Sequence, residues 1–309
     1  MYFKNFIKEN KLLIISAIVA VIILFFTFSS KKESENTKII SGQTIEQKKF
    51  DYDAVLNNIE AKSYYVYDVI HQKPIFAKSE HEKLPLASIT KLMSGLVVLD
   101  IMPETTIVTI NQEDLALGGD YSLILGEKWK LKDLLNYSLI ESSNVGMHAI
   151  ASALNYYEAV NNKDTVKIMN DRAVKLGLSD TFFINETGLD IDANMSGAYS
   201  SAYDVSILFT NILKNNPALI ADTNKASEHF ISESNIKHTA LNTDTAINKI
   251  PSMIASKTGL TDLAGGNLAI IFDVGPMHPV VIVVLGSSAE GRFSDVIKLA
   301  QITLQKFSE

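Results

Sequence analysis

The sequence predicts an α/β (α+β) domain whose sheet takes strands from both ends of the chain, preceded by one membrane-spanning helix. Patterns typical of β-strands occur near residue 64 and again beyond residue 254, and helical patterns fill the region between them. Strands at both ends with helices between them indicate a single α/β unit. Residues 12–28 form an apolar run without a charge, and this run predicts the membrane helix.

Composition narrows the classes of function. The 309 residues are 47% apolar and 20% charged, which is enough for a sizeable core. Residues 39–309 hold 22 basic and 32 acidic side chains, and this net charge of −10 argues against a nucleic-acid partner. The absence of cysteine excludes disulfides, cysteine metal sites and a thiol nucleophile. The six histidines lack a metal-ligand spacing such as His-Glu-x-x-His, so the sequence predicts no metal site.

The N-terminal region is expected to hold the protein at a membrane. We expect a short cytoplasmic segment at residues 1–11, a transmembrane anchor at 12–30 and a polar tether at 31–50. A cleaved signal peptide is the alternative, but the apolar run is longer than a usual signal core and Thr27-Phe28-Ser29 is a weak cleavage site. Lysines flank the run on both sides, so the positive-inside rule barely selects an orientation.

The remaining domain, residues 51–309, begins with a predicted hairpin of two strands, Tyr64–Ile70 and Pro74–Ala77. A helix is expected from Pro85 to Asp100, because proline suits a first helical turn and no breaker follows before Met102-Pro103. The later elements are expected in this order: helix Leu131–Asn155 with a polar interruption at 141–144, helices Thr165–Leu176 and Ala202–Leu213, strands Ile254–Thr258, Asn267–Val274 and Val280–Leu285, and helix Arg292–Phe307. The polar stretch after Pro217 shows no clear pattern.

A serine and a lysine lie one turn apart on the predicted 85–100 helix. Ser88 and Lys91 are three residues apart, so their side chains share one face of the helix. The helix is apolar on nearly all sides, which predicts burial. A buried lysine must find a partner or lose its charge, and a neutral lysine can activate a serine without histidine. Two other Ser-x-x-Lys copies, beginning at Ser29 and Ser234, lie in polar sequence, where an ordinary surface pair is expected.

Three short motifs follow one another along the chain: Ser88-Ile89-Thr90-Lys91 on a helix, Ser142-Ser143-Asn144 at a helix interruption, and Lys257-Thr258-Gly259 on a strand. Each residue also has an ordinary structural interpretation: Ser142 as a helix cap, Asn144 as a turn former, Lys257 as a strand-edge charge and Gly259 as a bulge. The combination of all three motifs, each on a suitable element, is more specific than any one of them.

With these motifs the chain resembles the serine-type D-alanyl-D-alanine carboxypeptidases, the low-molecular-mass penicillin-binding proteins, from about Tyr64 to Phe307. Asn185-Glu186-Thr187-Gly188-Leu189 also fits the family pattern. The resemblance implies a β-lactamase/transpeptidase-like fold, in which an antiparallel sheet flanked by helices adjoins an all-helical lobe. Val145 departs from the family, which often has an acid after the asparagine. No C-terminal domain or amphipathic anchor follows Phe307, so attachment is expected through the N-terminal helix.

The resemblance implies the same roles for the catalytic residues that their chemistry favours. Ser88 would be the nucleophile that forms an acyl-enzyme, and Lys91 would be its base. Ser142 would relay a proton to the leaving nitrogen. Asn144 would bond both the substrate amide and Lys91.

A second group of residues is expected to bind the substrate. Lys257 and Thr258 suit the terminal carboxylate, and Gly259 would let the strand approach the substrate closely. The family pattern places the oxyanion hole at the backbone N–H groups of Ser88 and Leu260. These residues complete the expected site.

The expected activity is removal of the terminal D-alanine from peptidoglycan stem peptides, without a cofactor and with β-lactams as inhibitors. The domain would act on the extracytoplasmic side of the cell membrane. D,D-endopeptidase cleavage of cross-links by the same site is the neighbouring alternative. A β-lactamase is less expected, because the middle of the chain lacks a convincing Glu-x-x-Leu-Asn deacylation element. The alternative of another class is a catalytically silent wall-binding protein with this fold.

Overall fold

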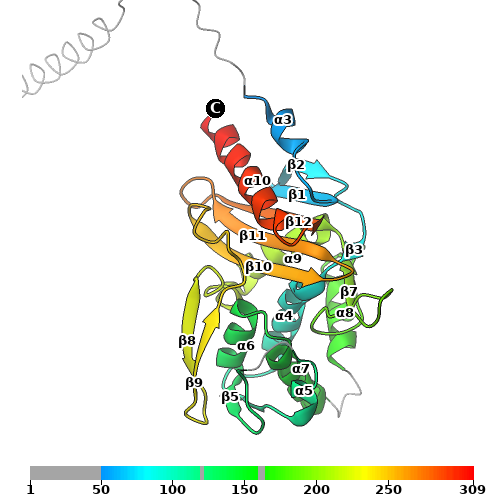
Figure 1. Cartoon of the computed structure of the whole chain (residues 1–309), viewed down its shortest axis with the longest axis vertical. Helices are drawn as coiled ribbons and strands as arrows, with labels where there is room; N and C mark the ends of the chain where they lie inside the picture. Colours follow the sequence, from blue (N-terminus) through cyan, green and yellow to red (C-terminus); the bar gives the residue numbers. More distant parts are fainter. Residues whose placement is uncertain (1–49, 119–121, 159–163) are drawn as a thin grey trace, which may run out of the picture. The chain divides into compact units, whose positions relative to one another are not determined.

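A five-stranded antiparallel sheet is the central element of the computed structural model, which describes residues 50–118, 122–158 and 164–309 (Figure 1). Its strands lie in the order β10 (Met253–Thr261), β11 (Gly265–Asp273), β12 (Pro279–Ser287), β1 (Ser63–Asp68) and β2 (Lys73–Lys78). In the pairing of β1 with β12, Tyr64 lies opposite Val284 and Asp68 lies opposite Val280. The predicted sheet with strands from both ends of the chain is therefore confirmed.

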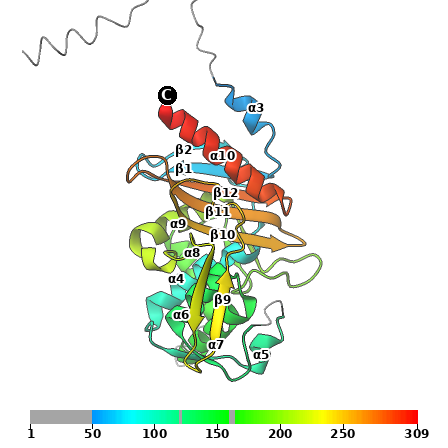
Figure 2. The ribbon, with the colours of Figure 1, turned by 60° about the vertical axis from the view of Figure 1, so that its left-hand side comes forward.

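Both faces of this sheet are buried, as β12 illustrates. Val280, Ile282 and Val284 belong to one hydrophobic cluster, whereas Val281 and Val283 belong to another, because successive side chains of a strand point to opposite faces. One face is covered by α10 (Gly291–Ser308) and α3 (Tyr52–Leu56), and the other by α9 (Ala202–Asn215) (Figures 1 and 2). This two-sided burial explains why the strand is continuously apolar instead of alternating.

The second part of the described chain is a lobe made mainly of helices. These are α4 (Lys91–Ile101), α5 (Gln112–Leu115), α6 (Leu131–Ile140), α7 (Asn144–Glu158) and α8 (Thr165–Lys175). The expectation of an all-helical lobe is wrong, since β4 (Ile107–Thr109) pairs there with β5 (Lys128–Lys130). Each of these short strands buries one apolar side chain, that of its middle residue, Val108 or Trp129. The predicted break between two helices at 141–144 is confirmed.

The predicted start of the helix at Pro85 is also wrong. Leu84–Pro85 forms a short strand, β3, in a three-stranded sheet with β7 (Ala198–Ser200) and β6 (Phe182–Phe183). Ala87 has a φ of +49°, a left-handed backbone conformation that prevents a regular helix from running on from Pro85. The helical turn therefore begins as a 3₁₀ segment, η1 (Ala87–Thr90), which leads directly into α4.

The polar stretch after Pro217 contains elements that the sequence pattern did not predict. A 3₁₀ turn, η3 (Pro217–Leu219), precedes a hairpin of β8 (Ser227–Ile231) and β9 (Lys237–Leu241). Most residues of the hairpin are partly or fully exposed, and its main apolar contact is Phe230, which packs against Trp129 and Tyr137. Phe230 is the buried residue of β8, and the buried residues of β9 are His238 and Ala240, so the hairpin contains too few large apolar side chains for its alternation to be detected in the sequence.

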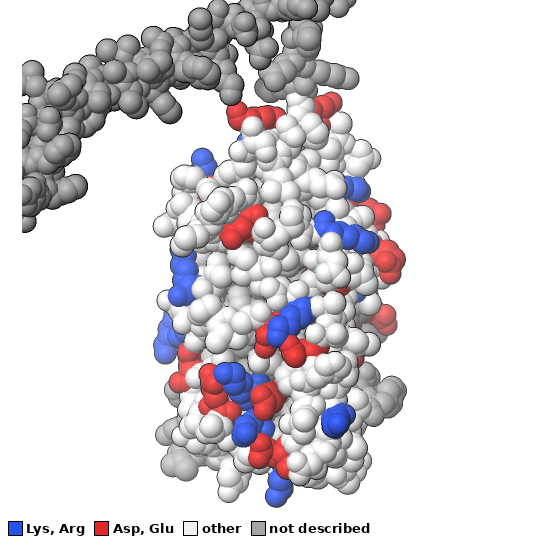
Figure 3. Space-filling view, turned by 90° about the vertical axis from the view of Figure 1, so that its left-hand side faces the viewer, with Lys and Arg blue, Asp and Glu red and all other residues white. Residues whose placement is uncertain are grey.

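The expected cytoplasmic segment (1–11), anchor (12–30) and tether (31–50) lie outside the described residues, except for Phe50. Of the helices in the described residues, none combines the length and apolar character needed to cross a bilayer. Among the described residues on the face shown in Figure 3, basic side chains are interspersed with acidic ones. This mixture of charges does not favour the binding of a polyanion to this face.

Candidate active site

Ser88 and Lys91 meet at the junction of η1 and α4. Lys91 is the first residue of α4 and is completely buried, while Ser88 is half-buried one turn earlier. The Lys91 Nζ atom lies 2.7 Å from Ser88 Oγ, 2.7 Å from Asn144 Oδ1 and 3.1 Å from the carbonyl oxygen of Thr187. Three neutral oxygens thus surround the amine, and one of them belongs to the candidate nucleophile.

The turn that carries Ser88 is held in a strained conformation by its neighbours. A left-handed backbone costs a non-glycine residue such as Ala87 about 1–2 kcal/mol. Gly188 packs so closely that a Cβ atom there would lie 1.9 Å from the Ala87 carbonyl oxygen. From the sheet, the Asn267 side-chain amide donates hydrogen bonds to the carbonyl oxygens of Pro85 (2.9 Å) and Leu86 (3.1 Å). These contacts position the serine.

The second motif lies at the junction of α6 and α7. Ser142 has a φ of +62°, which breaks the helix, and Asn144 begins the next one. The Lys257 Nζ atom donates hydrogen bonds to Ser142 Oγ (2.8 Å) and to the carbonyl oxygen of Thr258 (3.0 Å). Ser142 comes from the helical lobe and Lys257 from strand β10, so this bond joins the lobe to the sheet.

The third motif brings an outer strand of the sheet against the nucleophile's turn. Lys257 and Thr258 are buried on β10, and the Thr258 hydroxyl is hydrogen-bonded to that of Thr243. A Cβ atom on Gly259 would lie 2.7 Å from the Leu86 carbonyl oxygen and 3.3 Å from the Ser88 nitrogen. Only glycine therefore allows this approach, which brings predicted residues of all three motifs close together. Leu260, the next residue, is 50% exposed.

Both buried lysines have lowered pKa values, for related reasons. Burial lowers the pKa of Lys91 well below its usual value; the positive charge of Lys257 lowers it further, and the Glu186 carboxylate opposes the change. Burial likewise lowers the pKa of Lys257 to about 7, with a further decrease from Arg292 and an opposing effect of Asp244. An amine that loses its proton near neutral pH can accept one from a hydroxyl.

Residues 47–289 match the family model of the D-alanyl-D-alanine carboxypeptidases. The chain belongs to this carboxypeptidase family. The carboxypeptidase DacF of Bacillus subtilis (strain 168) is 28% identical over 254 residues, which cover 80% of this chain and 63% of DacF. A D-alanyl-D-alanine endopeptidase of Escherichia coli (strain K12) is 30% identical over 249 residues, which cover 78% of this chain and 76% of the endopeptidase.

The fold is likewise shared with a penicillin-binding protein. Penicillin-binding protein D2 from Listeria monocytogenes, in its ampicillin-bound form, superimposes with a TM-score of 0.66 at 24% identity, over 79% of this chain and 97% of the other. The aligned part of this chain spans 63% of DacF and 64% of the Escherichia coli DacD. These two carboxypeptidase relatives are therefore longer than this chain.

Arg292 is a site residue that sequence reasoning missed. Its Nη1 atom donates a hydrogen bond of 2.7 Å to the carbonyl oxygen of Gly259, and its charge lowers the pKa of Lys257. A signal existed, because Arg292 is one of only two arginines in the chain and lies in the first turn of α10, where the helix dipole disfavours a cation. An arginine in such a position indicates a partner outside the helix.

A second missed group consists of Glu186, His148 and Asp114, behind Lys91. The Glu186 side chain lies 2.6 Å from His148 Nδ1, and His148 Nε2 lies 3.9 Å from the buried Asp114 carboxylate. The hydrogen bond to Glu186 raises the pKa of His148, which favours the protonated imidazole beside this carboxylate. Glu186 precedes Thr187, whose carbonyl oxygen accepts a hydrogen bond from Lys91 Nζ, and the Glu186 carboxylate opposes the lowering of the Lys91 pKa.

Proposed function

We propose that this chain is a serine D,D-carboxypeptidase that removes the terminal D-alanine from peptidoglycan stem peptides. The observation that carries the proposal is the position of Lys91 Nζ, 2.7 Å from both Ser88 Oγ and Asn144 Oδ1. Lys257 and Ser142 complete the cleft on its other side. Membership of the family and the names of the carboxypeptidase relatives support the same activity.

In the proposed first step, neutral Lys91 takes the proton of the Ser88 hydroxyl while Oγ attacks the carbonyl carbon of the penultimate D-alanine. The oxyanion that forms is bound by the backbone N–H groups of Ser88 and Leu260, each worth about 3 kcal/mol to the transition state. Ser142 relays the proton held by Lys91 to the leaving nitrogen, the C–N bond breaks and D-alanine departs, which leaves Lys91 neutral. Water then hydrolyses the ester on Ser88 by the reverse sequence of proton transfers.

In the proposed complex, the terminal carboxylate of the substrate binds to Lys257 and Thr258. A carboxylate beside the Lys257 amine would raise its pKa, which is about 7 in the free protein, and so favour the charged form that binds it. Asn144 bonds the substrate amide as well as Lys91. Gly259 leaves room for the substrate backbone along β10.

We further propose that residues 12–30 anchor the protein in the cell membrane with the catalytic domain outside it. The charge-free run 12–28 and the requirement for peptidoglycan support this topology. In cells, the full chain should resist extraction with alkaline carbonate and should be digested by protease added to spheroplasts, whereas a chain lacking residues 1–49 should be extracted. Protection of the full chain from added protease would contradict the proposed orientation.

The activity is tested by the mass of the intact protein after exposure to benzylpenicillin. The wild type should gain the mass of one penicillin and retain it, whereas Ser88→Ala should gain none. Rapid loss of the adduct with turnover of penicillin would instead support a β-lactamase. The same two proteins are then incubated with a stem pentapeptide; D-alanine should be released by the wild type alone, and peptide binding without release would support a silent wall-binding protein.

Endopeptidase activity is the second candidate, because a D-alanyl-D-alanine endopeptidase is 30% identical to this chain. A cross-linked muropeptide dimer and a monomeric pentapeptide, supplied at equal concentrations, distinguish the two activities. We expect a higher kcat/KM for the pentapeptide. A higher value for the dimer would reassign the preferred reaction without changing the role of Ser88.

A further inference from the structure

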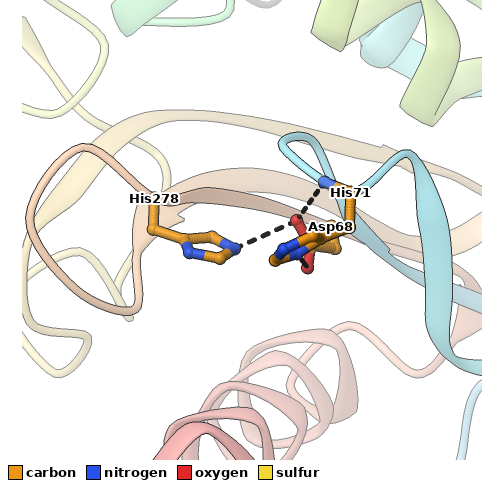
Figure 4. A group of neighbouring side chains, drawn as sticks. All are labelled: Asp68, His71 and His278. Atoms are coloured by element: carbon orange, nitrogen blue, oxygen red, sulfur yellow. Dashed lines mark hydrogen bonds and ion pairs between the residues drawn. The ribbon is translucent and has the colours of Figure 1, made fainter.

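A second cluster of reactive side chains lies at the C-terminal end of β1, the opposite end of the strand from Ser63. Asp68 ends β1, His71 lies in the turn before β2, and His278 lies in the loop before β12 (Figure 4). Figure 4 shows both imidazole rings directed at the same carboxylate. The sheet order β10-β11-β12-β1 places Asp68 three strands away from Lys257, so the cluster is separate from the active site.

The carboxylate of Asp68 is buried and fixed in orientation. Its Oδ1 atom accepts hydrogen bonds of 3.0 Å from the backbone N–H groups of Ile70 and His71, and lies 3.0 Å from His278 Nε2. Its Oδ2 atom lies 2.7 Å from His71 Nδ1. Backbone donors therefore hold one carboxylate oxygen, while the other faces an imidazole nitrogen, an arrangement that orients metal-ligating carboxylates in proteins.

The spacing of these atoms suits a small divalent cation. One donor atom from each residue can be chosen so that all lie within 4.8 Å of one another. Zinc binds histidine nitrogen and carboxylate oxygen at about 2.0–2.2 Å, so donors around a tetrahedral ion are separated by roughly 3.3 Å. His71 has 55% of its side chain exposed and His278 has 22%, so small rotations of both rings can reach that separation.

The type of donor selects among metals. Two imidazoles with one carboxylate suit zinc and related transition metals, whereas magnesium and calcium require oxygen ligands. Three protein ligands leave a fourth position for water, and two of the ligands, Asp68 and His71, also line a surface recess of about 400 Å³. Lys73 and Lys306 also line this recess, and their charges oppose a cation, so we expect micromolar and not nanomolar affinity.

We propose that Asp68, His71 and His278 form a zinc site that joins the β1–β2 turn to the β11–β12 loop. Zinc replaces the hydrogen bonds between the carboxylate and the rings, and water occupies the fourth position. Two connections of the sheet that are 210 residues apart, at Asp68 and His278, are thereby linked by coordinate bonds. Bound zinc is expected to stabilise the folded protein without altering the reaction of Ser88.

The proposal is tested by calorimetric titration of zinc chloride into chelator-treated, full-length protein. The wild type should bind one zinc ion per chain, and its melting temperature should rise with zinc concentration. His71→Gln and His278→Gln should each weaken binding by roughly 100-fold or more, since loss of an outer-shell partner alone costs 10–100-fold. Both variants keep Asp68 and its backbone hydrogen bonds, so they should fold, and penicillin should acylate them at the wild-type rate.

Two matched controls separate this site from other histidines. His81 lies 3.1 Å from the single carboxylate of Asp180, and His148 lies between Glu186 and Asp114. His81→Gln and His148→Gln should bind zinc as the wild type does. If zinc does not bind at one per chain, or if His148→Gln abolishes binding while His71→Gln leaves it intact, the proposal is wrong. The visible spectrum of cobalt-loaded wild type, which requires no variant, should show tetrahedral nitrogen and oxygen coordination; an octahedral spectrum would also overturn it.

Discussion

Within the described part of the chain, two serine–lysine pairs have nearly equal distances and different surroundings. Lys91 Nζ lies 2.7 Å from Ser88 Oγ, and Lys257 Nζ lies 2.8 Å from Ser142 Oγ. The first pair lies within one helical turn, whereas 115 residues separate the partners of the second. Around Lys91 are the neutral oxygens of Asn144 and Thr187; beside Lys257 is the cation of Arg292.

The different surroundings of the two lysines indicate that the environment of each amine, and not its bond to a serine, decides its chemical role. Lys91 is enclosed, receives the field of the second lysine, and is suited to be a neutral base. Lys257 lies on the strand next to Thr258, where a substrate carboxylate would restore its charge. The proposed mechanism requires both states in one cleft, and the four predictions below test this assignment.

Replacing each lysine by arginine is the strongest test, because arginine cannot lose its charge. Lys91→Arg should slow acylation of Ser88 by benzylpenicillin by about 10³-fold, since the general base is lost. Lys257→Arg retains a cation and should lose only about tenfold. Rapid-quench mass spectrometry measures both rates, and Lys83→Arg on the surface is the control. Equal losses in the two variants would contradict the division of roles.

Gly259→Ala tests whether the close approach of β10 to the nucleophile's turn is required. The added Cβ atom would lie 2.7 Å from the Leu86 carbonyl oxygen, so the strand must move away from Ser88. We expect a 10- to 100-fold loss of acylation rate and a decrease of about 1–3 kcal/mol in the free energy of unfolding. Gly275→Ala is the matched control, because a Cβ atom there would meet nothing within 4 Å. Wild-type kinetics in Gly259→Ala would show that the approach is dispensable.

Lys91→Met tests whether burial lowers the pKa of the proposed base. The pKa of Lys91 is lower in the folded than in the unfolded chain, so the unfolded chain binds more protons in the window between these two values. Across that window, the unfolding free energy of the wild type should rise with pH relative to Lys91→Met. The rise is limited to about 1.4 kcal/mol per pH unit for one proton. Urea denaturation between pH 7 and 10 measures the unfolding free energies of the two proteins. A difference that stays constant with pH would argue against a buried lysine with a lowered pKa. The exposed substitution Lys128→Met serves as the control.

Glu186→Gln should give the smallest effect, a shift of the pH profile for acylation. The Glu186 carboxylate raises the pKa of Lys91, so its removal should move the acidic limb of the profile to lower pH and increase the rate severalfold on that limb. His148→Gln removes the imidazole that, when protonated, offsets the charge of Glu186, so it should move the limb to higher pH. If neither variant moves the limb, the ionisation that it reports is not that of Lys91.

How well the site could be predicted from the sequence depended on how far apart along the chain the contacting residues lie. The Ser88–Lys91 pair follows from a three-residue spacing on one helix, a local rule. The meeting of Ser142 with Lys257 came only from the family resemblance, because no periodicity predicts a contact across 115 residues. Strands β11 and β12 of the central sheet were predictable because they are long and apolar, whereas the polar β8–β9 hairpin was not.

Backbone conformation was the other limit. Pro85 was assigned to a helix because proline suits a first helical turn, but the left-handed Ala87 that follows cannot be recognised from its residue type. Arg292, in contrast, could have been identified, because a rare arginine in the first turn of a helix conflicts with the helix dipole. The amide of Asn267 illustrates an interaction that no local pattern contains.

That amide has a consequence for biosynthesis. Asn267 follows Pro85 by 182 residues, and its side chain also accepts a hydrogen bond from the Gly286 N–H group. A growing polypeptide thus displays the serine on the ribosome long before the residues that shape its turn have been translated. The turn that carries Ser88 can therefore reach its folded conformation only after the last strands have joined the first.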